Sequence, residues 1–358
     1  MNRGQTLRRL GAALQGRVAP DVDWLALLDL ANRALVTPSL HQALKTSTAV
    51  PQDAAAFLAE VAARSEARNQ LLRRTAAEAV AALNAAGIEP VLLKGMALWA
   101  SQPASAPFAR MMSDVDLMVT PNDAGRAVSA LEAAGFGVLA RYPGSAQHVV
   151  AELGRPLDAG AVDLHQRPPG PPGMALAFDP DAHTTPSDWC GSVRVPSPAY
   201  QIYLMCLHDQ FHDGGYWRGG FDLRHLQDIA ELTRLPDGVD WLALDAVTPT
   251  RLARNAIHSE LVAAREIMGA DIPEPLRRRS TPKLHYRRHL AQNRHPKLGL
   301  VFAGLGLLAE APNLAEHRAV NRQGWCRLSE QRTGPTDRRW GLRPSRIRGL
   351  MKMRGGKI

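Results

Sequence analysis

The chain has 358 residues, 45% of them hydrophobic and 5% aromatic, which suffices for two domains or for one domain with large helical additions. Its net charge of +9 comes from the C-terminal part: residues 276–358 hold 20 Lys and Arg against 4 Asp and Glu, whereas the remaining residues hold 23 basic and 30 acidic ones. Three scattered cysteines, Cys190, Cys206 and Cys326, argue against a disulfide framework and a structural zinc site.

Signals for export and for membrane insertion are weak in this sequence. The first residues carry positive charge but no long apolar core and no cleavage site, so no signal peptide is predicted. The most apolar late stretch, 298–308, is about 11 residues long, short of the roughly 20 that cross a bilayer. We therefore expect a cytoplasmic protein with no transmembrane segment.

The N-terminal region, 1–86, has helical patterns. Residues 23–35 form one expected helix, with Asp21 or Asp23 near its cap. Residues 53–86 are rich in Ala, Leu, Glu and Arg, which predicts one long helix or two stacked ones. No catalytic pattern occurs before Gly87, where this helix is expected to stop.

The next region, 87–197, alternates between strand and helix patterns. The expected elements are a strand at 91–93, helical turns at 96–100, a strand at 113–119, a helix from 121 to 134, and strands at 147–153 and 161–165. This order predicts a small mixed α/β sheet.

Helical patterns return in the region 198–275. The expected helices are 199–212, 223–234, 240–246 and 251–268. After Pro273 the periodicity fades, and 276–358 form a basic tail. Such a tail suits RNA, DNA, an anionic membrane surface or an acidic partner protein, and the sequence leaves these open beside a merely solubilising role.

Two carboxylates, Asp114 and Asp116, lie two residues apart in the apolar strand at 113–119. Side chains at this spacing share one face of a strand, and two unpaired buried carboxylates are costly. A divalent cation would compensate them, and magnesium commonly bridges one or two carboxylates to phosphates. An exposed edge strand with two surface aspartates is the alternative.

Basic residues and a glycine stand close to this pair in the sequence. Lys94 and Gly95 end the preceding strand, where a glycine lets backbone N–H groups approach phosphate oxygens. Lys94 is expected to contact a phosphate as a point charge, and Arg110 to clamp another. Ordinary ion pairs with the two aspartates are the alternative for both residues.

A third carboxylate, Asp163, lies in another apolar strand. Phosphoryl transfer needs carboxylates around the reacting phosphate, and one of them attracts the proton of the attacking hydroxyl; Asp163 is the expected residue. Glu152 and Asp158 are weaker candidates. His165 shares the strand face of Asp163 and either contacts substrate or is a buried structural histidine.

These motifs together resemble a known family. The order of Lys94-Gly95, Arg110, Asp114-x-Asp116-Leu117 and Asp163-Leu164-His165 is similar to the uncharacterised bacterial nucleotidyltransferases, a branch of the DNA polymerase beta-like superfamily. The resemblance covers about residues 80–235, including the later helical part from His208 to Asp228. It departs from the superfamily at Met96, where a serine usually contacts phosphate.

The resemblance implies an α+β fold: a polymerase-beta-type palm with a small mixed sheet at 87–197, N-terminal helices at 1–86, a helical lobe at 198–275 and the basic tail. It implies that Asp114, Asp116 and Asp163 bind Mg²⁺, or Mn²⁺ in its place. It further implies transfer of a nucleotidyl group from a nucleoside triphosphate such as ATP to a hydroxyl acceptor. A peptide or small molecule is the favoured acceptor, with RNA open through the tail.

A second histidine motif stands in the helical part. His208 and His212 are four apart on one expected helix, a spacing that fits zinc, with Asp222 or His225 as a third ligand. We favour instead that His208 faces the nucleotide cleft or packs between helices. Within the same region Arg224 and Asp228 are expected to form a helical ion pair.

Three other functions stay open on this scaffold. Transfer of the γ-phosphoryl group would make the protein a kinase. A degenerate palm would bind nucleic acid or a partner through the basic tail without turnover. A toxin-like enzyme would modify transfer RNA docked on that tail.

Overall fold

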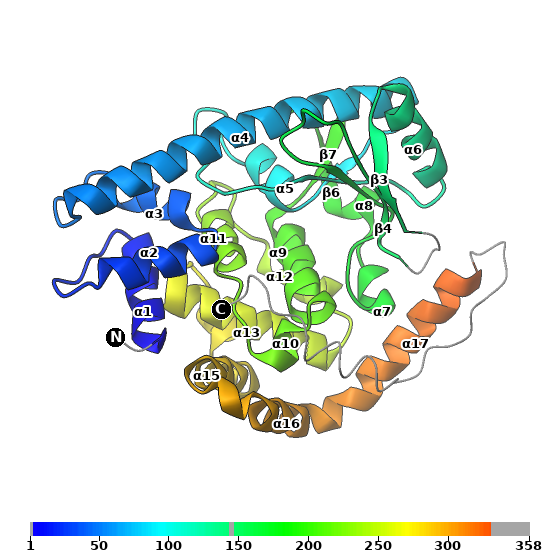
Figure 1. The fold of residues 1–358 in the computed structure, drawn as a ribbon. Helices are drawn as coiled ribbons and strands as arrows, with labels where there is room; N and C mark the ends of the chain where they lie inside the picture. The colour runs from blue at the N-terminus through cyan, green and yellow to red at the C-terminus, as the bar shows by residue number, and fades with distance from the viewer. Residues whose placement is uncertain (1–2, 143–146, 331–358) are drawn as a thin grey trace.

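The computed structural model describes residues 3–142 and 147–330, and it confirms an α+β protein (Figure 1). Seven strands form one mixed sheet in the order β3-β4-β5-β2-β1-β7-β6. The strands are β1 (Val91–Leu92), β2 (Val115–Met118), β3 (Gly137–Arg141), β4 (Val149–Gly154), β5 (Val162–His165), β6 (Thr184–Ser187) and β7 (Val193–Pro196).

Strand alternation gives the two faces of the sheet different chemistry. Val115 and Leu117 of β2 and Val162 and Leu164 of β5 are fully buried in one apolar core. Their neighbours in sequence, Asp116 and Asp163 among them, must point to the opposite face because side chains alternate along a strand. The sheet therefore separates an apolar face from a face that carries the acids.

The apolar face is covered by two helices, α4 (Gln52–Ala85) and α6 (Ala124–Ala133). The first is a single 34-residue helix that runs along the top of the molecule in Figure 1. Its buried residues, from Leu72 to Leu83, pack on the sheet, while Gly87 follows it with a φ of +72° as an expected stop. The sequence predicted one long helix or two stacked ones here, and the structure has one.

The acid-bearing face looks toward a helical lobe. Its main helices are α9 (Pro198–Cys206), α11 (Leu223–Leu232), α12 (Trp241–Val247) and α13 (Arg251–Met268), joined by the π-helical turn η1 (Leu207–His212) and α10 (Gly215–Arg218). Met118 and Val91 from the sheet belong to the same apolar core as these helices. The lobe is therefore packed onto the sheet.

The helices α1 (Arg3–Leu14), α2 (Trp24–Arg33) and α3 (Thr37–Leu44) share the core of the helical lobe. The first part of α4 joins this core through Leu58, and its later part packs on the sheet. Asp23 caps α2 by accepting a hydrogen bond from the Ala26 N–H, as expected. The N-terminal region thus divides between two cores.

Four helices occupy part of the region that was expected to be a tail without periodicity. They are α14 (Glu274–Arg277), α15 (Ser280–Arg294), α16 (Gly299–Glu310) and α17 (Leu314–Glu330), with the 3₁₀ turns η2 (Pro296–Leu298) and η3 (Ala311–Asn313) between them. In Figure 1 they pass along the bottom of the molecule and rise beside α7 (Pro172–Ala175). The rest of the predicted tail, 331–358, lies outside the described residues.

By length and composition, one helical stretch of the described chain, Pro296–Leu328, could cross a membrane. Only 11% of its most apolar window is buried. Its middle is nevertheless fixed to the protein body, because Glu310 is fully buried and accepts hydrogen bonds from Tyr216 and Asn255.

Candidate active site

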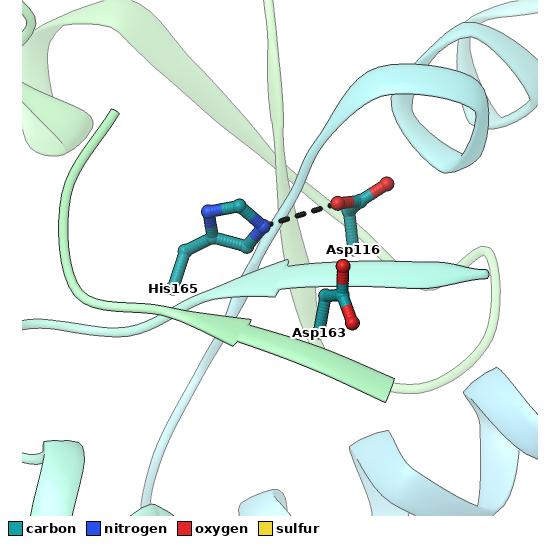
Figure 2. Close-up of side chains that lie close together, drawn as sticks. All are labelled: Asp116, Asp163 and His165. Atoms are coloured by element: carbon teal, nitrogen blue, oxygen red, sulfur yellow. Dashed lines mark hydrogen bonds and ion pairs between the residues drawn. The ribbon is translucent and has the colours of Figure 1, made fainter. Parts of the chain in front are cut away.

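Asp116 and Asp163 stand opposite each other on neighbouring strands. Strands β2 and β5 run parallel, and their register pairs Asp116 with Asp163 and Met118 with His165. Figure 2 shows the two carboxylates and the imidazole gathered on one side of these strands. Asp116, Asp163 and His165 each offer a ligand atom within 4.8 Å of the others, so the group could hold a metal ion.

Two nitrogen groups already contact Asp116. The Lys94 ammonium lies 2.6 Å from Oδ1, and His165 Nε2 lies 3.0 Å from the same oxygen. His165 is fully buried, and burial lowers its pKa, so the neutral imidazole donates its Nε2 proton to the carboxylate. Lys94 thus forms the ion pair that the sequence left open as an alternative to a phosphate contact.

The two facing carboxylates differ in protonation. Burial raises the pKa of Asp163 from 3.8 to about 7, and the charges of Asp116 and Asp114 act in the same direction. Burial acts on Asp116 too, but the Lys94 charge and the His165 hydrogen bond outweigh it and lower the pKa of Asp116. At neutral pH Asp116 is charged, whereas Asp163 is near its midpoint.

Asp114 lies just before β2 and outside the group of three ligand atoms. Burial raises the pKa of its carboxyl, and the negative charge of Asp116 adds to this, while Lys94 and Arg224 lower it. Arg224 therefore acts on the site from the helical lobe.

Arg110 packs closely against Gly95. A Cβ at Gly95 would lie 2.4 Å from Arg110 Nη1 and 2.7 Å from Met112 Sδ, so only glycine fits beside this guanidinium. Arg110 Nε donates to both carboxylate oxygens of Asp228, at 2.8 and 3.0 Å, with both side chains buried. Asp228 therefore pairs with Arg110, and the expected pair with Arg224 is wrong.

The histidine motif of the helical part is rearranged by the π-helical turn η1. His208 lies 3.4 Å from Asp213 through Nδ1 and lines a small cavity together with Lys94. Neither His208 nor His212 belongs to a metal-compatible group among the described residues. The group in this region is instead Asp209, Asp222 and His225.

The weaker acidic candidates have other partners. Glu152 is paired with Asp163 across β4 and β5, and it accepts a hydrogen bond of 2.5 Å from the Tyr142 hydroxyl. Asp158 binds Arg155 at 3.0 Å. Neither belongs to a metal-compatible group in the part of the chain that the structure describes.

A pocket of about 400 Å³ begins one side chain beyond His165. The His148 ring lies 5.5 Å from the His165 ring and 4.5 Å from the His212 ring, and burial lowers the pKa of His148 to about 3. The pocket is lined by Gln147, His148, Arg167, Gly170, Pro171, Pro172, Phe211, His212, Asn321 and Trp325. It holds one cationic side chain and no acid.

Sequence reasoning missed the pocket residues His148, Arg167 and Trp325. His148 follows from the register of β4 on β5, which the strand pattern could have suggested. Trp325 comes from α17, far along the chain, and no local pattern links it to the sheet. Burial lowers the pKa of Arg167 to about 10, which leaves this side chain charged at neutral pH.

The carboxylates of Asp116 and Asp163 fit a hard divalent cation, because magnesium prefers oxygen ligands and carboxylates in particular. The ammonium of Lys94 holds a positive charge where such an ion would bind, which supports the fit. His165 orients Asp116 through the hydrogen bond described above.

Comparison with known proteins gives one finding. A family model described as "Uncharacterised nucleotidyltransferase" matches residues 20–269, well over half of the chain. No curated protein and no solved structure matches the chain significantly.

Proposed function

The chain belongs to the family of uncharacterised nucleotidyltransferases, and from this premise we propose that it transfers a nucleotidyl group from a nucleoside triphosphate to an acceptor hydroxyl. The observation that carries the proposal is the pairing of Asp116 with Asp163 on parallel strands, together with the ion pair between Asp116 and the Lys94 ammonium. We propose a polymerase-beta-type palm for the sheet and a nucleotide site between the sheet and the helical lobe.

Asp116, Asp163 and Asp114 would hold Mg²⁺, or Mn²⁺, whose charge offsets that of the triphosphate when it is bound. Lys94 contributes a positive charge at the start of α5 (Lys94–Ser101), and Arg224 contributes one from α11. Arg110 acts indirectly, because its guanidinium is buried against Asp228 and Gly95. We propose that it positions the start of α5 instead of clamping a phosphate.

Asp163 is the proposed proton acceptor. In the metal-free site its pKa is raised to about 7, mainly by burial and by the charges of Asp116 and Asp114. We propose that this carboxylate, beside the bound metal, accepts the proton of the attacking hydroxyl. The hydroxyl oxygen then bonds to the α-phosphorus, the bond from that phosphorus to the bridging oxygen breaks, and pyrophosphate leaves with the electron pair.

We place the acceptor in the pocket of about 400 Å³ beyond His165. In-line displacement needs the acceptor opposite the leaving pyrophosphate. In the sheet, β1 lies on one side of the pair β2 and β5, which carry the carboxylates, and β4 lies on the other. Lys94 begins α5, which follows β1, whereas His148 of the pocket precedes β4. The pocket is therefore on the far side of the carboxylates from Lys94. Neutral imidazoles, Arg167 and two aromatic rings suit an acceptor with an anionic group and a flat or apolar part.

The test uses purified protein, Mg²⁺, cell extract as acceptor source, and nucleoside triphosphates labelled at the α- or γ-phosphorus. Transfer of α-label is expected, and Asp116→Asn and Asp163→Asn should each reduce it by about a hundredfold or more. Asp158→Asn, the same chemical change on an acid bound to Arg155, should leave it unchanged.

Other labels would contradict the proposal in different ways. Transfer of γ-label alone would make the protein a kinase. Absence of both transfers together with absence of nucleotide binding would favour a non-catalytic binding module.

A further inference from the structure

The helix α16 exposes an unusually apolar surface. Six large aliphatic residues in and next to this helix are 47% to 77% exposed: Leu298, Leu300, Val301, Leu305, Leu307 and Leu308. Leu284 of α15, the helix beside α16, is 54% exposed as well. We name these seven residues the leucine patch. A cluster of exposed aliphatic side chains on two neighbouring helices is typical of an interaction site.

Basic residues lie beside the leucine patch. Residues 276–309 contain eight Lys and Arg and no Asp or Glu. Lys283, Arg287, Arg294 and Lys297 are exposed in this stretch, on α15 and the turn that leads into α16. Exposed aliphatic and basic side chains therefore lie together on α15, α16 and the turn between them, and we call the four exposed basic residues the basic rim. These helices lie at the edge of the molecule opposite α4 (Figure 1).

The geometry of α16 suits a surface helix. Its 12 residues span about 18 Å, well short of the roughly 30 Å of a bilayer core. Its last residue, Glu310, is buried and bound to Tyr216, Asn255 and His285, which keeps the helix against the protein body. The aliphatic side chains can enter a membrane interface while the rest of the protein stays outside it.

We propose that the leucine patch and its basic rim dock on an anionic lipid surface. The basic rim attracts acidic headgroups, and the aliphatic side chains enter the layer beneath them. A nucleic acid would match the charge but leave the aliphatic side chains in water. A second copy of the chain would cover them but would bring two positive rims together. The proposal does not depend on the proposed transfer activity.

The experiment is co-sedimentation of the full chain with phosphatidylcholine vesicles that contain or lack phosphatidylglycerol. Binding is expected only to the anionic vesicles and should weaken at high salt. The variant Arg287→Gln/Arg294→Gln/Lys297→Gln should bind about a hundredfold more weakly, since each basic residue near the surface contributes about fivefold. The variant Leu300→Ser/Leu305→Ser/Leu308→Ser should lose binding by at least about a hundredfold.

A matched control removes exposed leucines elsewhere. Leu25, Leu157 and Leu242 are 82%, 98% and 83% exposed, and Leu25→Ser/Leu157→Ser/Leu242→Ser should bind like wild type. Circular dichroism checks that every variant is folded.

Four results would overturn the proposal. The first two are no vesicle binding by folded wild type and equal binding to neutral and anionic vesicles. The third is wild type that binds no vesicles but self-associates, with the leucine variant unable to do so. The fourth is wild type that binds no vesicles but retains RNA, with the leucine variant retaining RNA equally. The last two would identify a second copy of the chain or a nucleic acid as the occupant.

Discussion

Lys94 combines an ion pair to Asp116 with an uncommon backbone conformation. Its φ is +47°, in the left-handed region that non-glycine residues seldom adopt, at the junction between β1 and α5. Such strain costs about 1–2 kcal/mol and persists where the surroundings demand it. In this conformation the Lys94 ammonium forms its ion pair with Asp116.

Two substitutions at Lys94 separate these effects. Lys94→Gly and Lys94→Ala both remove the ammonium, so both should reduce nucleotidyl transfer to a similar extent. The glycine variant should be more stable than the alanine variant by about 1 kcal/mol, because glycine adopts a positive φ without strain. Urea unfolding at one pH measures the difference; equal stabilities would show that the backbone is unstrained.

The raised pKa of Asp163 has a consequence for metal binding. Below its pKa of about 7 the carboxyl carries a proton that Mg²⁺ must displace. The apparent Mg²⁺ affinity should therefore rise between about pH 6 and 8 and then level off. Asp163→Asn should bind more weakly and lose this dependence. Calorimetric titrations at several pH values test the expectation, which a flat wild-type profile would contradict.

At the scale of single elements, long or strongly patterned segments were predicted well. The helix α4 and the strands β2 and β5 follow from Ala-rich helical sequence and from apolar alternation. The strands β3, β6 and β7 were not expected, because they are short and owe their place to pairing with neighbours; β7, for example, pairs with β1 and β6.

The helix α15 shows why the last helices escaped prediction. Its buried side chains include His285, Arg288, His289 and Gln292, so the buried face is polar and hydrophobic periodicity cannot reveal it. Its contacts come from distant parts of the chain: Arg288 donates to the carbonyls of Tyr216 and Trp217. Such a face is recognisable only once its partners are in place.

The same limit applies to the candidate site. Asp116, Asp163 and His165 could be predicted because each lies in an apolar strand whose alternation sets its face. The group of Asp209, Asp222 and His225 was predicted only in part. Asp222 and His225 were expected as alternative ligands beside His208 and His212, but the group contains Asp209 from the π-helical turn instead of either histidine. The roles assigned to all these residues remain predictions.

The crossing of α7 and α17 depends on two glycines. A Cβ at Gly324 would lie 2.4 Å from the Gly173 nitrogen and 2.7 Å from its Cα, so Gly324→Ala should push α17 away and displace Trp325 from the pocket. We expect altered transfer to the acceptor with unchanged Mg²⁺ affinity. Trp fluorescence and transfer assays measure this.

A second glycine in a helix is the control for that substitution. Gly125 in α6 has open space around it, and Gly125→Ala should stabilise the protein by about 0.5–1 kcal/mol without affecting transfer. If both alanine variants behave alike, the α7–α17 crossing does not shape the pocket.

At the scale of the whole molecule, one buried ion pair joins the segment before β2 to the helical lobe. Arg110 and Asp228 are 7% and 3% exposed, and their atoms approach to 2.8 Å. Buried pairs contribute little net stability, but removal of one partner leaves an uncompensated charge. The pair therefore makes the relative placement of sheet and lobe sensitive to either residue.

Asp228→Asn is expected to destabilise the protein by about 3–5 kcal/mol, because the guanidinium of Arg110 then lacks its counter-charge. The double variant Arg110→Met/Asp228→Leu should recover much of this loss. Chemical unfolding of the single and double variants forms a mutant cycle, and additive effects would mean that the two side chains are not coupled.

The contact between Lys94 and Asp116 makes the arrival of a metal an exchange of cations. Without metal the ammonium already balances the charge of Asp116, so an incoming Mg²⁺ must displace it. The released ammonium needs a new anion, and the phosphates of a nucleotide supply one. Metal and nucleotide are then thermodynamically linked, and each should bind more tightly in the presence of the other. Magnesium titrations with and without a non-hydrolysable nucleotide would detect this cooperativity, and Lys94→Ala should abolish it.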